Sequence, residues 1–121
     1  MIRAVITIAL GFWALSAAAD LRVLEQVEQP YELDLPSVSM PGNPAGTVSF
    51  KTCDTCRLEF HSVYSGTKYF VNGRELAFKD FLPAVEKVRS SATPDSLPLV
   101  GVFVDIKSQR VTRITVRQGA N

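Results

Sequence analysis

The chain has 121 residues, of which 46% are hydrophobic and 21% are charged, and its formal net charge at pH 7 is +1. This length supports a single hydrophobic core. A nearly neutral chain lacks the basic excess that binding to nucleic-acid phosphates requires, and equally the polybasic cluster that holds proteins on acidic membrane surfaces. We therefore expect one small domain that binds neither nucleic acid nor a membrane surface.

The first nineteen residues have the pattern of a secretory signal peptide. Arg3 precedes an apolar run from Ala4 to Leu15, and small residues follow at 16–19. The run is shorter than the roughly 20 apolar residues that a membrane-spanning helix needs. We expect cleavage after Ala19, no stable membrane anchor, and a periplasmic or secreted protein of bacterial origin. Because only Arg3 is lost among the charged residues, the thirteen basic residues become twelve and balance the twelve acidic ones.

Residues 20–46 differ in composition from the rest of the mature chain. They contain five acidic side chains against one basic side chain, together with four prolines. Frequent prolines disfavour both a helix and a central strand. We expect an acidic, extended arm that lays Leu21–Val27 on the core or uses the spacing of Tyr31, Leu33 and Leu35 for an edge strand. A flexible leader is the alternative.

The region around the cysteines shows strand alternation on both sides. Val48 and Phe50 alternate with polar residues, and so do Leu58 and Phe60. A shift of one residue in strand pairing turns a whole apolar set to the opposite face. We therefore expect Phe50 to lie opposite Leu58, and Val48 opposite Phe60. The register that places Glu59 opposite Phe50 is rejected.

Two patterns in the middle of the chain predict a tight turn and a helix. Asn72-Gly73 separates two short strand patterns, and a hairpin turn of this type needs a positive φ at both positions. Apolar residues then recur at helical spacing from Phe81 onward, with Asp80 as the expected N-cap. Pro83 falls in the first turn of this helix, where its missing N–H loses no hydrogen bond.

A strand hairpin over residues 99–104 and 111–117 is expected to end the domain. The first of its strands is apolar enough to be covered on both faces. The order of elements predicts an α+β domain over residues 47–121. We expect an antiparallel sheet or a small, partly open barrel of the OB type, with one helix between the middle strands and the C-terminal hairpin.

Cys53 and Cys56 are the only cysteines and form a Cys-Asp-Thr-Cys motif with three interpretations. We favour a structural disulfide, which paired thiols form in an oxidising compartment. A thiol–disulfide redox site is the second, but the strand pattern after Cys56 lacks the helix whose N-terminus lowers a thiol pKa. The third is a copper or zinc site completed by His61. Strand alternation counts against it, because Cys56 and His61 lie an odd number of residues apart.

No catalytic constellation is visible in the sequence. His61 is the only histidine, and on the polar side of its predicted strand it is expected to be solvated or hydrogen-bonded rather than a general base. Neither a glycine-rich phosphate loop nor a pair of catalytic carboxylates accompanies it. We assign no catalytic residue, expect no cofactor, and favour a non-enzymatic role.

Two groups of side chains are candidates for a binding surface. The aromatic residues Tyr64, Tyr69 and Phe70 surround the expected turn at 65–67, and arginines follow the last strand. Both residue types are enriched in binding interfaces. The alternative is that the aromatics belong to the core and the arginines protect a sheet edge. We expect a binding domain for a protein or small molecule outside the cytoplasm, with thiol–disulfide exchange or metal carriage as the alternative function. The candidate binding residues are Tyr64, Tyr69, Arg110, Arg113 and Arg117.

Overall fold

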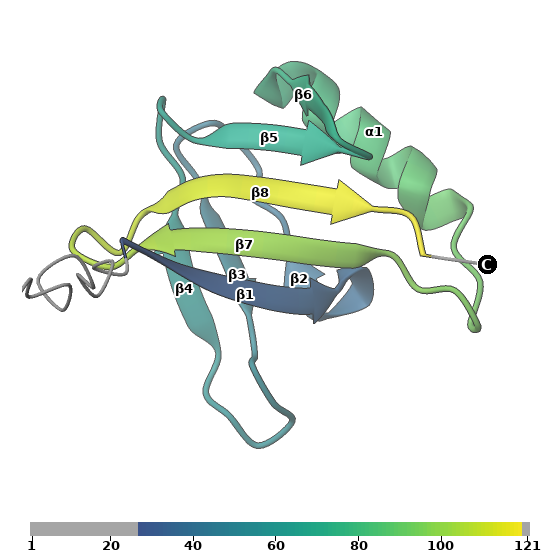
Figure 1. The fold of residues 1–121 in the computed structure, drawn as a ribbon, viewed down its shortest axis with the longest axis horizontal. Coiled ribbons are helices and arrows are strands. Elements are labelled where there is room, and N and C mark those ends of the chain that lie inside the picture. The colour runs from purple at the N-terminus through teal and green to yellow at the C-terminus, as the bar shows by residue number, and fades with distance from the viewer. Residues whose placement is uncertain (1–26, 120–121) are drawn as a thin grey trace, which may run out of the picture.

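A computed structural model describes residues 27–119 of the chain, which form two β-sheets and one α-helix. The expected signal peptide and its cleavage after Ala19 lie outside the described residues, as does nearly all of the segment Leu21–Val27. No helix within the described range has the length and apolar character of a membrane span. The elements in chain order (Figure 1) are β1 (Glu28–Asp34), the short 3-10 helix η2 (Leu35–Ser37), β2 (Val38–Ser39), β3 (Thr47–Phe50), β4 (Glu59–Ser62), β5 (Lys68–Val71), β6 (Arg74–Leu76), α1 (Phe78–Ser90), β7 (Leu99–Asp105) and β8 (Val111–Arg117).

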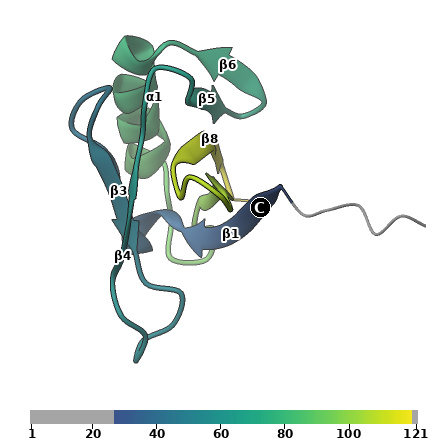
Figure 2. The same cartoon turned by 90° about the vertical axis from the view of Figure 1, so that its left-hand side faces the viewer.

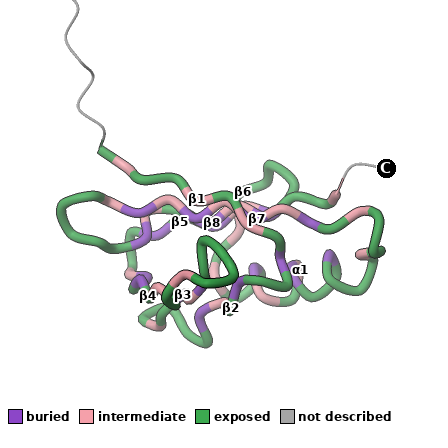
Figure 3. The backbone as a smooth tube through the Cα atoms, turned by 90° about the horizontal axis from the view of Figure 1, so that it is seen from below, coloured by how far each residue is buried: buried purple, intermediate pink, exposed green. Residues whose placement is uncertain are grey.

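The structure confirms a mixed α+β fold built in two layers. One layer is a five-stranded sheet of order β1-β7-β8-β5-β6, and the other contains a three-stranded sheet of order β2-β3-β4. The small sheet and α1 lie side by side against one face of the large sheet (Figures 2 and 3). The described strands form two separate sheets and no closed barrel.

One strand pair departs from the expected antiparallel sheet. β5 and β8 run parallel, whereas the other neighbouring strands are antiparallel. Parallel neighbours need a long crossover connection. Here β6, α1 and β7 lie between β5 and β8 in the chain, so the helix returns the chain across the inner face before the C-terminal hairpin is added.

The inner face of the large sheet and the second layer share one hydrophobic core. β1 pairs with β7 along its whole length and is an edge strand, the alternative that the spacing of Tyr31, Leu33 and Leu35 offered, although Leu35 itself lies in η2. Leu35 and Val38, from the same acidic segment, are 1% and 5% exposed. The described part of that segment therefore packs into the common core. The fully buried side chains of the core include Val48, Phe50, Phe81, Val100, Val102, Val111, Ile114 and Val116.

The register between β3 and β4 is the one that the sequence analysis rejected. Phe50 lies opposite Glu59, and His61 lies opposite a buried valine of β3. Leu58 and Phe60, which the expected register placed in the core, are 47% and 64% exposed. The expectation is wrong because His61 takes the inward position: its ring stacks on that of Phe50 at a centroid distance of 5.7 Å.

Helix α1 begins earlier than predicted. Ala77 is its N-cap, in place of Asp80, and its carbonyl accepts the N–H of Asp80 at 3.0 Å. Pro83 consequently lies inside the helix, in the second turn and not in the first. The first helical residue, Phe78, packs its ring on that of Tyr69 with centroids 5.3 Å apart. This aromatic contact favours the earlier start over a side-chain cap from Asp80.

Two turns confirm their predictions and set the strand registers of the large sheet. Asn72 and Gly73 have φ values of 50° and 83° and join β5 to β6. Between β7 and β8, the carboxylate of Asp105 accepts the N–H groups of Lys107 at 2.8 Å and Ser108 at 3.0 Å. The hydrogen bonds from Ser108 and Lys107 hold the pKa of Asp105 below its ordinary value.

Candidate functional site

The large sheet has an outer face that no other described element covers (Figure 3). Its middle row of side-chain positions runs across four strands, from Glu32 on β1 through Gly101 on β7 and Thr115 on β8 to Phe70 on β5. Because side chains alternate between the two faces of a strand, these residues all lie opposite the core.

Two further rows flank the middle one. Phe103 lies opposite Arg113 in one row, and Leu99 lies opposite Arg117 in the other. The expectation that β7 is covered on both faces is therefore wrong. Its inner valines are at most 1% exposed, whereas its outer residues are only half-buried, because the second layer covers one face alone.

The three rows enclose an open groove of about 600 Å³ on the outer face. Gly101 and Thr115 form its floor. A Cβ atom added at Gly101 would lie 2.6 Å from the Thr115 hydroxyl oxygen and 3.1 Å from the ring of Phe103. The Thr115 hydroxyl and the edge of the Phe103 ring therefore fill the space over Gly101 that a side chain would take. Among the described residues, the Thr115 hydroxyl has no hydrogen-bond partner.

Arg113 is ordered at one end of the groove. Its guanidinium lies 3.9 Å from the centroid of the Phe103 ring, and its Nη2 atom lies 3.8 Å from Glu28 Oε2. The hydroxyl of Thr112 donates to the other carboxylate oxygen of Glu28 at 2.8 Å. The cation is therefore oriented, and its charge is balanced in part, before any ligand arrives.

Arg117 stands at the other end of the groove and is exposed. It makes no hydrogen bond or ion pair with another described residue. It lies four positions after Arg113 on β8, or about 13 Å along the strand. Glu32, on the opposite side of the groove, likewise has no partner among the described residues. The groove thus contains one balanced arginine and two unbalanced, opposite charges.

The structure distributes the five predicted binding residues over three places. Arg113 and Arg117 line the groove. Arg110 precedes β8 and lies over the ring of Tyr64, with its guanidinium 4.1 Å from the ring centroid. Tyr69 is 4% exposed and belongs to the core, where burial raises its pKa. The arginines do not protect a sheet edge, because β8 is the central strand of the large sheet.

Several groove residues were missed from the sequence. They are Glu32, Leu99, Gly101 and Phe103. Gly101 carried a usable signal, since an isolated glycine within a strand pattern often marks a close approach of another group. Glu32 carried none, because it joins the groove only through the pairing of β1 with β7. Phe70 belongs to the aromatic residues expected around the turn at 65–67, and the pairing of β5 with β8 places it in the groove.

His61 is a core residue and does not lie on a polar strand face. It is 7% exposed, and its Nδ1 atom donates to the carbonyl of Gln109 at 3.2 Å. Its ring lies between those of Phe50 and Tyr31, at centroid distances of 5.7 and 6.0 Å. Its Nε2 atom is 4.0 Å from a carboxylate oxygen of Glu59. The side chain thus joins β4 to the turn between β7 and β8.

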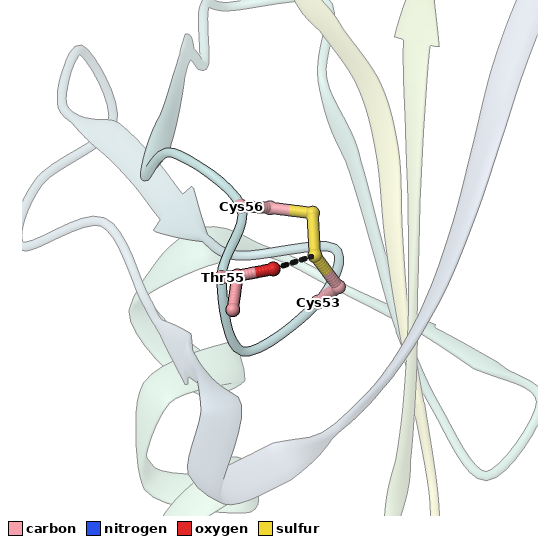
Figure 4. The surroundings of a disulfide bond; sticks show 3 residues. All are labelled: Cys53, Thr55 and Cys56. Atoms are coloured by element: carbon pink, nitrogen blue, oxygen red, sulfur yellow. Dashed lines mark hydrogen bonds between the residues drawn. A yellow bond between two sulfur atoms is a disulfide. The ribbon is translucent and has the colours of Figure 1, made fainter.

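Cys53 and Cys56 form a disulfide in the loop that joins β3 and β4 (Figure 4). Cys53 is exposed and Cys56 is half-buried. The hydroxyl oxygen of Thr55 lies 3.6 Å from the sulfur of Cys53. No helix begins at the motif, because the next element is strand β4 from Glu59.

The described residues do not assemble the expected metal ligands. The metal interpretation required His61 beside Cys53 and Cys56, but His61 lies in the core, whereas the two sulfurs are joined in a loop. Between residues 27 and 119, no three His, Cys, Asp or Glu side chains are grouped so that they could hold a metal ion.

No protein-family model, curated protein or solved structure matches this chain. Its function is therefore inferred from the arrangement of its own residues. The groove on the outer sheet face and the Cys53–Cys56 loop are the two candidate sites.

Proposed function

We propose that this protein is a small exported binding domain whose ligand site is the groove on the outer face of the large sheet. The observation that carries the proposal is a hollow of about 600 Å³ with aromatic and charged walls. Small-molecule sites have this size and combine apolar walls with a few polar groups. Export rests on the signal-peptide pattern of residues 1–19, and the disulfide is in keeping with an oxidising compartment. The proposed activity needs neither a cofactor nor a catalytic residue.

The composition of the outer face supports a binding role. A sheet face open to water usually carries polar side chains. Here Phe70, Leu99 and Phe103 remain half-buried around a glycine, although no described element covers them. The likeness to a partly open OB-type barrel stays a prediction. The proposed site does not depend on it, because the groove lies on the outer face of an open sheet and not inside a barrel.

Replacing Arg113 and Arg117 together by alanine tests this proposal. Both side chains are exposed, so the free energy of unfolding should fall by only about 1 kcal/mol, mainly through the lost contacts of Arg113. Amide NMR shifts of the wild-type protein, measured with a library of small charged and neutral compounds, should cluster on β5, β7 and β8. The double variant should lose these shifts.

A matched control removes two arginines away from the groove, Arg74 on β6 and Arg89 on α1. This control variant should keep the wild-type shifts. The proposal fails if the library perturbs other surfaces but not the groove, or if the loss of Arg113 and Arg117 leaves groove binding unchanged.

Thiol–disulfide exchange is a second candidate function, supported by the exposure of Cys53 and its contact with Thr55. That hydroxyl is placed to donate a hydrogen bond to a Cys53 thiolate after reduction. The missing helix N-terminus counts against this function. In space the motif lies beside the groove, because Cys53 lines a neighbouring hollow together with Glu32 and Leu99, which also line the groove. We do not extend the proposal to metal carriage, because the described residues offer no third ligand to the cysteines.

Equilibration with glutathione buffers, followed by alkylation and mass measurement, distinguishes a redox site from a scaffold. We expect a reduction potential below about −300 mV, as structural disulfides have. A potential near about −200 mV would instead support an exchange function. A variant with serine at both Cys53 and Cys56 is the reference for the stability that the disulfide contributes. It should be less stable than the wild type by only about 2 kcal/mol, because closing so short a loop removes little chain entropy.

A further inference from the structure

The unbalanced charges of the groove indicate the kind of ligand. Arg117 on β8 and Glu32 on β1 are both exposed and lack a partner among the described residues. They lie two strands and two residues apart on one face, or about 12 Å between Cα atoms. By contrast, Arg113 already pairs with Glu28 at 3.8 Å. Two opposite, unpaired charges across one hollow are complementary to a ligand that carries both a carboxylate and an ammonium group.

The floor and walls of the groove indicate what lies between those charges. The edge of the Phe103 ring lies over Gly101, and the small side chain of Thr115 forms the floor between Phe103 on β7 and Phe70 on β5. These two phenylalanines come from β5 and β7, which lie on opposite sides of β8, and they are offset by two residues along the strands, so their Cα atoms are about 12 Å apart. That separation admits one planar ring in offset or edge contact with both walls.

We infer that the groove binds a free aromatic amino acid, an assignment that rests on the proposed binding function. Its carboxylate lies on the guanidinium of Arg117, its ammonium group faces Glu32, and its ring lies over Thr115 between the two phenylalanines. The Thr115 hydroxyl offers one further polar contact. A ligand with a carboxylate alone would leave Glu32 beside its negative charge, so the zwitterion is the better complement.

Four probes separate the contributions of the three groups. L-Phenylalanine carries all of them, N-acetylphenylalanine lacks the ammonium group, phenylalaninamide lacks the carboxylate, and L-alanine lacks the ring. Each is titrated into the exported protein while amide NMR shifts are followed. We expect phenylalanine to shift the amides of Gly101, Thr115 and Arg117. Each analogue should bind at least about tenfold more weakly than phenylalanine.

Two single variants assign the charges. Arg117→Gln should weaken phenylalanine and N-acetylphenylalanine about tenfold and leave phenylalaninamide unchanged. Glu32→Gln should weaken phenylalanine and phenylalaninamide and leave N-acetylphenylalanine unchanged. Arg89→Gln and Glu86→Gln are matched controls, because these residues pair with each other on α1 at 3.6 Å and should not affect any probe.

The outcomes separate this inference from the proposed function. Equal binding of phenylalanine and N-acetylphenylalanine, or no effect of Glu32→Gln, would overturn the amino-acid assignment while leaving groove binding in place. A phenylalanine-containing dipeptide is titrated as a fifth probe. If it binds more tightly than phenylalanine, the ligand is a peptide and the free-amino-acid assignment is overturned. If no probe shifts the groove amides at millimolar concentration, the inference fails, and the compound library with the double arginine variant decides the proposed function independently.

Discussion

Replacing Phe50 by alanine is expected to lower the free energy of unfolding by about 3–5 kcal/mol. Phe50 is fully buried at the junction of the two sheets. Its ring contacts Tyr31 of β1 at a centroid distance of 5.0 Å and His61 of β4 at 5.7 Å. Removing it opens a cavity that neither sheet can fill alone. Since domains of this size are stable by only about 5–15 kcal/mol, urea unfolding followed by circular dichroism should show a large decrease in midpoint.

Phe60→Ala is the matched control for this experiment. It removes the same side chain from the neighbouring strand, where Phe60 is 64% exposed, and should change stability by no more than about 0.5 kcal/mol. The pair of variants also tests the strand register. If Phe60→Ala cost as much as Phe50→Ala, Phe60 would be a core residue, and the observed pairing of β3 with β4 would be contradicted.

The second large effect is expected at Thr67, whose replacement by valine should cost about 2–4 kcal/mol. Thr67 is 7% exposed. Its hydroxyl donates to the carbonyl of Val111 at 2.6 Å and accepts the N–H of Tyr64 at 3.0 Å. Valine preserves the shape but leaves both backbone groups without this partner, so the turn after β4 loses its link to the start of β8. Chemical denaturation of the variant measures the loss.

Thr115→Val and Thr67→Ser complete that experiment. The Thr115 hydroxyl has no partner among the described residues, so the same change there should alter stability by less than about 0.5 kcal/mol. Serine at position 67 keeps the hydroxyl and should recover most of the lost stability. A Thr67→Val variant as stable as Thr115→Val would show that the buried hydrogen bonds contribute nothing measurable.

Local chemistry made several features predictable from the sequence. Asn72-Gly73 suits a turn that needs two positive φ values, and both are observed. Alternation along residues 111–117 placed Arg113 and Arg117 on the side opposite Ile114, which is where the structure has them. These features depend on residues that are close in the chain, so short-range patterns contain the necessary information.

The β3–β4 register and the start of α1 could not be predicted in this way. A polarity pattern assigns Phe60 to the core and His61 to the solvent. The structure reverses them, because the His61 ring finds both an aromatic stack with Phe50 and a carbonyl acceptor at Gln109. That acceptor lies 48 residues away in the chain. Only tertiary contacts of this kind make the burial of a polar ring favourable.

The sequence by itself therefore determined the α+β character, the turns, the hairpin at the C-terminus and the cysteine pair that forms the disulfide. The tertiary structure alone decided the groove. Glu32, Phe70, Gly101 and Arg117 come from four strands, and they meet because β1 joins the edge of β7 while the helix returns the chain so that β8 can lie parallel to β5. Pairing between strands far apart in the chain leaves little trace in local patterns, so a site built across such strands becomes visible only in the folded protein.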